Sequence, residues 1–188
     1  TGAGARQCVT DIGAAVDGAD AAAFESLVDV DAILTAALDI FVQRARDPKA
    51  AGELPPMLAI LFAQAASGEQ GNATLRSVLL AESRAFVMNG ISSGAFAGRK
   101  SANSATQGVL APLFADASTG RKEIRQVGEA RGKGGDWLGR FTVHDHGNGE
   151  SYRVTGRVHF AGGKPRLVAV ENLEALMDQV ANENRALQ

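Results

Sequence analysis

Cysteine and long hydrophobic runs are scarce in this sequence, and each scarcity excludes a class of structure. Cys8 is the single cysteine, so an intrachain disulfide is excluded. In its helical context we expect Cys8 to be a small buried hydrophobe. No apolar run approaches the roughly 18 residues that a membrane span requires. We therefore predict no transmembrane segment.

Catalytic and cofactor-binding motifs are missing as well. The nucleophile elbow Gly-x-Ser-x-Gly does not occur. The stretch 94–101 resembles a phosphate-binding loop, but three residues separate its glycines where the motif has four, and no strand precedes it. These absences predict a protein without a cofactor and favour a non-catalytic role.

Alanine divides the chain into two parts. It is frequent in residues 1–117 and rare in 118–170, where glycine, arginine, β-branched and aromatic residues prevail. Apolar residues recur at intervals of three or four in the first part and of two in the second, which predicts helices first and strands last. A chain of 188 residues can bury roughly 70% of its unfolded surface in one core.

The predicted fold class is α+β in a single domain, residues 1–188. N-terminal helices, in about residues 6–117, pack on a curved antiparallel sheet of about four strands, in about 122–171, and a C-terminal helix covers about 172–185. The first helix is expected over 6–28. The turn at 147–149 predicts a hairpin in which Val143 pairs with Val154.

This order of elements resembles the cone-shaped fold of nuclear-transport-factor-2-like and cystatin-like proteins. Bacterial members of that superfamily often open with a helix that ends as this one does at Asp20, Phe24, Val28 and Asp29. They close with a strand similar to residues 164–171. The resemblance implies a cavity between helices and sheet, and it points to exported bacterial members of unassigned role.

Positive charge gathers in the predicted sheet. Residues 121–166 carry 10 Lys and Arg against 5 Asp and Glu, although the net charge of the chain is only −2. Nucleic-acid binding would need this charge interleaved with stacking aromatics, and at least two of the four aromatics there have the phase of the apolar face, so we expect no nucleic-acid partner. We predict a ligand or partner surface on the outer sheet face, formed by Arg140, Arg153, Arg157 and Trp137.

Two histidines are weak candidates for a metal site. His144 and His146 alternate on one strand and so project to the same face, where two imidazoles could share a zinc or copper ion. In the predicted register, however, His144 lies opposite Arg153. We therefore expect an exposed hairpin end and no metal.

Two alternatives to a binding role stay open. The first is a small acid–base enzyme of isomerase or dehydratase type, because the resemblance implies a pocket Asp with a Tyr or His partner; the weak candidates are Asp29 or Asp31 with Tyr152. An Asp at a helix start also serves as a cap, which is the simpler role. The second alternative is a structural homodimer module.

The function that we favour from the sequence is a non-catalytic binding or interaction module of the bacterial cell envelope. Its partner would be an unidentified small molecule or envelope protein, held in the cavity or on the basic sheet face, and a homodimer is possible. The chain starts at Thr1 without an initiator methionine. That start favours a removed signal peptide, and hence an exported, periplasmic or extracellular protein.

Overall fold

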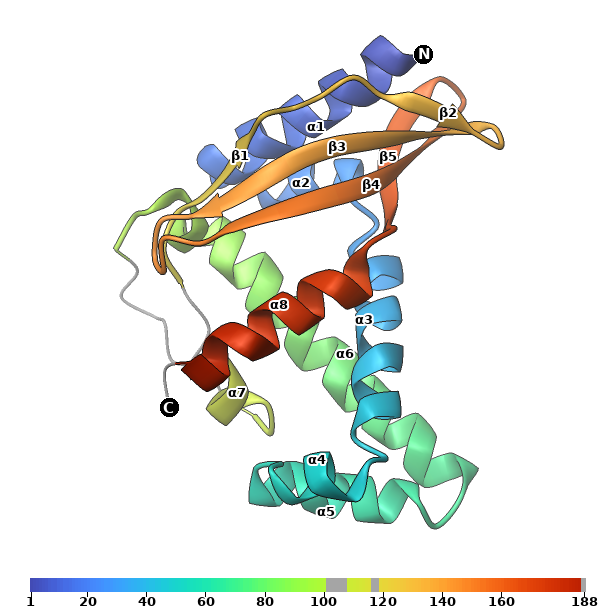
Figure 1. The fold of residues 1–188 in the computed structure, drawn as a ribbon, viewed down its shortest axis with the longest axis vertical. Helices are drawn as coiled ribbons and strands as arrows, with labels where there is room; N and C mark the ends of the chain where they lie inside the picture. The colour runs from blue at the N-terminus through green and yellow to red at the C-terminus, as the bar shows by residue number, and fades with distance from the viewer. Residues whose placement is uncertain (101–107, 116–118, 187–188) are drawn as a thin grey trace. The chain divides into compact units, whose positions relative to one another are not determined.

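The computed structural model describes residues 1–100, 108–115 and 119–186, and its elements follow the predicted α+β order (Figure 1). The helices that precede the sheet are α1 (Gly2–Asp17), α2 (Ala21–Leu27), α3 (Val30–Arg44), α4 (Pro48–Gly52), α5 (Pro56–Ala65), α6 (Glu69–Ser92), the short η1 (Ala95–Ala97) and α7 (Ala111–Ala115). The strands and the last helix are β1 (Lys122–Arg125), β2 (Arg131–Lys133), β3 (Asp136–Asp145), β4 (Ser151–Ala161), β5 (Lys164–Val170) and α8 (Leu173–Ala186).

The chain divides into two compact units. The first comprises residues 1–33, 90–101 and 118–188, and contains α1, α2, η1, the sheet and α8. The second comprises residues 34–89 and 102–117. Helices α3 and α6 each begin in one unit and end in the other. This division does not test whether the chain folds as a single domain, which stays a prediction.

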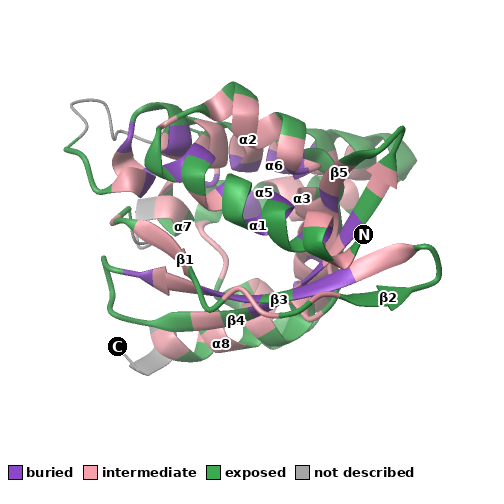
Figure 2. Ribbon diagram, turned by 90° about the horizontal axis from the view of Figure 1, so that it is seen from above, coloured by how far each residue is buried: buried purple, intermediate pink, exposed green. Residues whose placement is uncertain are grey.

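The sheet has five antiparallel strands in the order β1-β3-β4-β5, and β2 also pairs with β3. Strands β1 and β2 pair separately with β3. Between them, Gln126 has a left-handed backbone with φ of 53°, which side chains larger than glycine rarely adopt, and the strand is interrupted there. Figure 2 shows that β2 is exposed throughout.

The predicted hairpin register is wrong by two residues. Val143 pairs with Tyr152, and Phe141 pairs with Val154. The cause is a wider turn, which runs over residues 146–150. The Asp145 side chain accepts a hydrogen bond from Gly147 N, and the Asp145 backbone N–H donates to the carbonyl of residue 150, both over 2.8 Å.

Helix α1 packs on one face of the sheet, here called the helix-covered face. Val9 of α1 contacts Phe141 and Val154 in a core that Leu176 of α8 also joins. Gly13 lets the helix approach β1, because a Cβ there would lie 3.3 Å from the side chain of Ile124. As predicted, Cys8 is fully buried.

Carboxylates cap the N-termini of α2 and α3. The predicted helix over 6–28 breaks at Ala19, whose φ is 52°, and Asp20 then caps α2 by accepting from Ala23 N over 3.0 Å. Asp29 precedes α3 and accepts from Ala32 N over 3.1 Å. Each carboxylate satisfies an N–H that has no partner within its helix.

The second unit has a helical core of its own. Its buried side chains come from α3, α5, α6 and the segment before α7: Val42, Leu58, Leu75, Leu79 and Leu110. The carboxylate of Glu82 on α6 accepts hydrogen bonds from Val109 N over 2.8 Å and from Leu110 N over 2.7 Å. These bonds satisfy two backbone N–H groups just before α7.

Candidate functional site

Arginines gather on the sheet face opposite to the helix-covered face. Alternate residues of a strand point to the same side, and the register aligns the arginine positions of four strands on one side. We call this side the arginine face; it carries Arg125, Arg131, Arg140, Arg153 and Arg157. The aromatic residue predicted for this surface lies elsewhere, because Trp137 shares the phase of Phe141 and contacts Gly2 of α1.

Two of these arginines are neutralised by carboxylates. Arg125 Nε donates to Glu123 over 2.7 Å. Arg157 Nε donates to Glu171 over 2.6 Å, and the Arg157 guanidinium also lies 3.9 Å from Asp136. The hydrogen bond from Arg125 lowers the pKa of Glu123, and that from Arg157 lowers the pKa of Glu171. The charges of Arg125 and Arg157 are therefore balanced by carboxylates of the same chain.

Arg140 and Arg153 differ from these pairs. Both side chains are exposed, and neither forms an ion pair with any residue of the described parts of the chain. Arg140 pairs with Thr155, and Thr142 pairs with Arg153, so the two arginines are diagonal neighbours on one face. Such neighbours are about 7–8 Å apart.

A fixed polar group lies beside these two arginines. Thr142 is buried on the arginine face, and its hydroxyl donates to the side-chain oxygen of Gln126 over 3.0 Å. Gln126 is the residue with the left-handed backbone after β1. The bond from Thr142 joins this residue to β3 beside the two arginines.

The structure brings the two candidate metal ligands together without completing a site. The rings of His144 and His146 are 4.6 Å apart and edge to face. His144 Nδ1 lies 2.8 Å from the Ser151 hydroxyl, and His146 Nε2 lies 3.2 Å from Glu123. Within residues 1–100, 108–115 and 119–186, no group of three or more His, Cys, Asp or Glu side chains has the geometry of a metal site.

A buried ion pair lies at the hairpin end of the helix-covered face, and sequence reasoning missed it. Lys122 Nζ is 3.0 Å from Asp145 and 2.8 Å from the carbonyl of Gly120, and it lies 5.2 Å from the ring centre of Phe96. The Asp145 side chain is 6% exposed. Burial lowers the pKa of Lys122, and the carboxylate of Asp145 opposes that shift.

The acid–base candidates are not neighbours. Asp29 caps α3 and lies 3.7 Å from Arg166, and Asp31 is exposed in the first turn of the same helix. The backbone of Asp29 bonds to Leu167, which pairs with Val158. Tyr152 is six residues further along β4, or about 20 Å at 3.3 Å per residue.

Tyr152 has partners of its own. Its hydroxyl donates to Glu183 of α8 over 2.7 Å and accepts from Asn148 over 3.1 Å. Burial, followed by the hydrogen bond to Glu183, raises the pKa of Tyr152 to about 12. A phenol with so high a pKa keeps its proton at neutral pH and is a poor general base.

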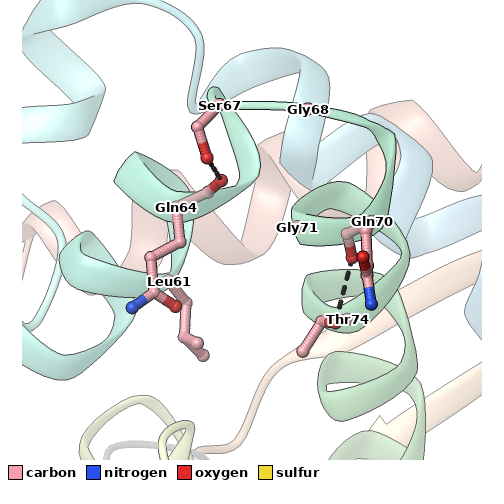
Figure 3. A pocket seen from close by; sticks show the side chains of 7 residues that line it. All are labelled: Leu61, Gln64, Ser67, Gly68, Gln70, Gly71 and Thr74. Atoms are coloured by element: carbon pink, nitrogen blue, oxygen red, sulfur yellow. Dashed lines mark hydrogen bonds between the residues drawn. The ribbon is translucent and has the colours of Figure 1, made fainter.

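A pocket of about 380 Å³ lies in the second unit, where α5 turns into α6 (Figure 3). The residues that line it are neutral: Leu61, Gln64, Ser67, Gly68, Gln70, Gly71 and Thr74. The hydroxyls of Ser67 and Thr74 donate to backbone carbonyls within this segment, over 2.6 Å and 3.0 Å. The pocket thus offers neither a titratable group nor a nucleophile activated by a base.

Comparison of the chain with protein-family models, with curated proteins and with solved structures gives no match. The resemblance to the cone-shaped fold and the expected envelope location therefore stay predictions. Among the helices of the described residues, none has both the length and the apolar character of a membrane span. The function must be argued from the arginine face itself.

Proposed function

We propose that this protein is a non-catalytic binding module whose arginine face binds an acidic partner. The observation that carries the proposal is the contrast within that face. Arg157 is neutralised by Glu171, whereas Arg140 and Arg153 are exposed and form no ion pair with the described residues. A guanidinium in this state has its donors available for two parallel hydrogen bonds to a carboxylate.

The spacing of the two arginines favours an extended acidic segment. Diagonal neighbours on a sheet face are about 7–8 Å apart. In an extended peptide, side chains on one side recur every second residue, which is about 7 Å. A partner with carboxylates at alternate positions of an extended segment therefore matches Arg140 and Arg153. The adjacent Arg131 is also exposed and adds to the positive field.

The experiment measures the affinity of a glutamate-rich peptide by isothermal titration calorimetry at low ionic strength. The test variant is Arg140→Glu/Arg153→Glu. The matched control is Arg46→Glu/Lys49→Glu, which makes the same change in net charge at two exposed residues outside the sheet. We expect the test variant to lose at least about tenfold in affinity, since two charge contacts are removed at about 1 kcal/mol each.

Two results would refute the proposal. One is that wild type does not bind the peptide at low salt. The other is that the control variant loses as much affinity as the test variant, because the attraction would then depend on net charge and not on the arginine face. Binding must also weaken as salt rises, because exposed charges are screened beyond about 8 Å at physiological ionic strength.

A further inference from the structure

Half of β4 has no strand on one of its sides. Strand β5 pairs with β4 only over residues 156–161. Along the edge from Ser151 to Thr155, the one backbone hydrogen bond to the β5 side within the described residues is that from Glu171 N to the Thr155 carbonyl, over 2.8 Å. In Figure 1, α8 follows directly on β5 and lies beside β4. An uncovered edge of this kind presents unpaired N–H and C=O groups that can template another strand.

Side-chain amides take the place of the missing strand. Asn172, just before α8, accepts from Thr155 N over 2.9 Å and donates to the Arg153 carbonyl over 2.8 Å. Gln179 of α8 donates to the Ser151 carbonyl over 3.1 Å. Polar side chains thus bond three backbone groups of this edge, and the backbone of an added strand could take their place.

Helix α8 contacts the sheet through polar and partly buried side chains. Up to Glu183, none of its side chains is fully buried, and Val180 is 44% exposed. Leu176 packs against the core of the helix-covered face, and Glu183 accepts from Tyr152. A helix without a fully buried side chain over this range is among the elements that detach most readily from a domain.

We propose that the Ser151–Thr155 edge of β4 is a strand-acceptor site that α8 covers, and that its occupant is an extended acidic segment of a partner protein. The choice of occupant rests on charge complementarity. A residue of the added strand that faces the arginine face lies about 5 Å from Arg153, Cβ to Cβ. Main-chain hydrogen bonds then supply affinity, and the contact with Arg153 supplies selectivity, while Arg140 on β3 adds only to the positive field. This inference rests on the proposed function and specifies its partner.

The first test uses the full chain and the same glutamate-rich peptide, in unmodified form and with N-methyl groups at alternate backbone amides. Methylation keeps every carboxylate but removes the N–H groups of one edge of the peptide. We expect methylation to lower the affinity about tenfold or more. In hydrogen exchange, we expect the unmodified peptide to protect the amides of Ser151 and Arg153 and to deprotect the backbone of α8.

The second test weakens the contacts between α8 and the edge of β4. The variant Asn172→Ala/Gln179→Ala removes the amides that hold α8 to the edge, and we expect it to bind the unmodified peptide several-fold more tightly than wild type. Asn182→Ala is the matched control, because this amide is exposed on α8, and we expect it to leave the affinity unchanged. The methylated peptide is tested on wild type, so that result holds even where the variant fails to fold.

The outcomes separate the two proposals. If both peptides bind equally in an Arg140- and Arg153-dependent manner, and Ser151 and Arg153 exchange unchanged, strand addition is overturned while the proposed function stands. If neither peptide binds, the proposed function fails and this inference fails with it. If the Asn172→Ala/Gln179→Ala variant forms a dimer without peptide, the edge accepts a second copy of the chain, which overturns the peptide as its occupant.

Discussion

The Tyr152 hydroxyl donates a 2.7 Å hydrogen bond to Glu183, so the chain's one tyrosine joins the sheet to α8. Burial and this bond raise the pKa of Tyr152 to about 12, from an ordinary value of 10.0. The folded state therefore holds the phenolic proton more tightly than the unfolded state. The stability that this provides is complete below pH 10 and is lost as the pH rises to about 12.

Tyr152 is predicted to titrate near 12 in the folded protein, as measured by the near-ultraviolet absorbance of the phenolate. Because no other tyrosine is present, the signal has one source. Glu183→Gln is expected to lower the pKa of Tyr152 and to leave it above 10, since burial remains. Glu150→Gln, which removes an exposed carboxylate of the hairpin, is the control. A midpoint near 10 in the folded wild type would contradict this account.

The ion pair between Lys122 and Asp145 is predicted to contribute strongly to stability. Asp145→Ala removes the carboxylate that pairs with Lys122 and that accepts from Gly147 N, and we expect the free energy of unfolding to fall by about 3 kcal/mol. The measurement is urea unfolding at neutral pH. Glu129→Ala, at a carboxylate that is 95% exposed, is expected to cost less than about 0.5 kcal/mol. Equal losses in the two variants would mean that the pair is unimportant.

The sequence contained part of the signal for this pair. Lys122 lies on the same side of its strand as Ile124, and Asp145 lies on the same side as Val143. Two opposite charges therefore stand at positions where the alternation predicts apolar residues. The alternation predicted which sheet residues share a face, because the period of two depends only on neighbouring residues. It could not predict the register, because that depends on how Asp145 widens the turn.

Other relationships left no trace in the sequence. The contact of Tyr152 with Glu183 depends on where α8 lies after β5 ends, and no periodicity encodes that. The helix-covered position of Trp137 follows from the same alternation that places Arg140 on the opposite face, so the prediction of Trp137 on the arginine surface is wrong. The α+β order itself was predicted correctly, since it depends on local periods and turn residues.

Arg157 and Arg140 are predicted to have different roles although they share a face. Arg157→Ala breaks the bond to Glu171 and leaves Asp136 with one cation fewer, so we expect it to lower the free energy of unfolding by about 1 kcal/mol. Arg140→Ala is expected to change it by less than about 0.5 kcal/mol and to weaken binding of the glutamate-rich peptide more. Urea unfolding and calorimetry of both variants check this, and the reverse ranking in both measurements would reject the division of roles.

The turn between α5 and α6 is predicted to require a glycine at position 71. A Cβ there would lie 2.4 Å from the carbonyl oxygen of Gln64, which is a backbone atom that cannot rotate away. Gly71→Ala must therefore push α5 and α6 apart, and we expect a loss of about 1–3 kcal/mol together with a change in the pocket of Figure 3. Gly52→Ala is the matched control, because a Cβ at that helical position has open space and alanine favours helix. The measurement is the melting temperature of the two variants. If Gly71→Ala and Gly52→Ala have the same melting temperature, the close approach of α5 and α6 does not require glycine at position 71.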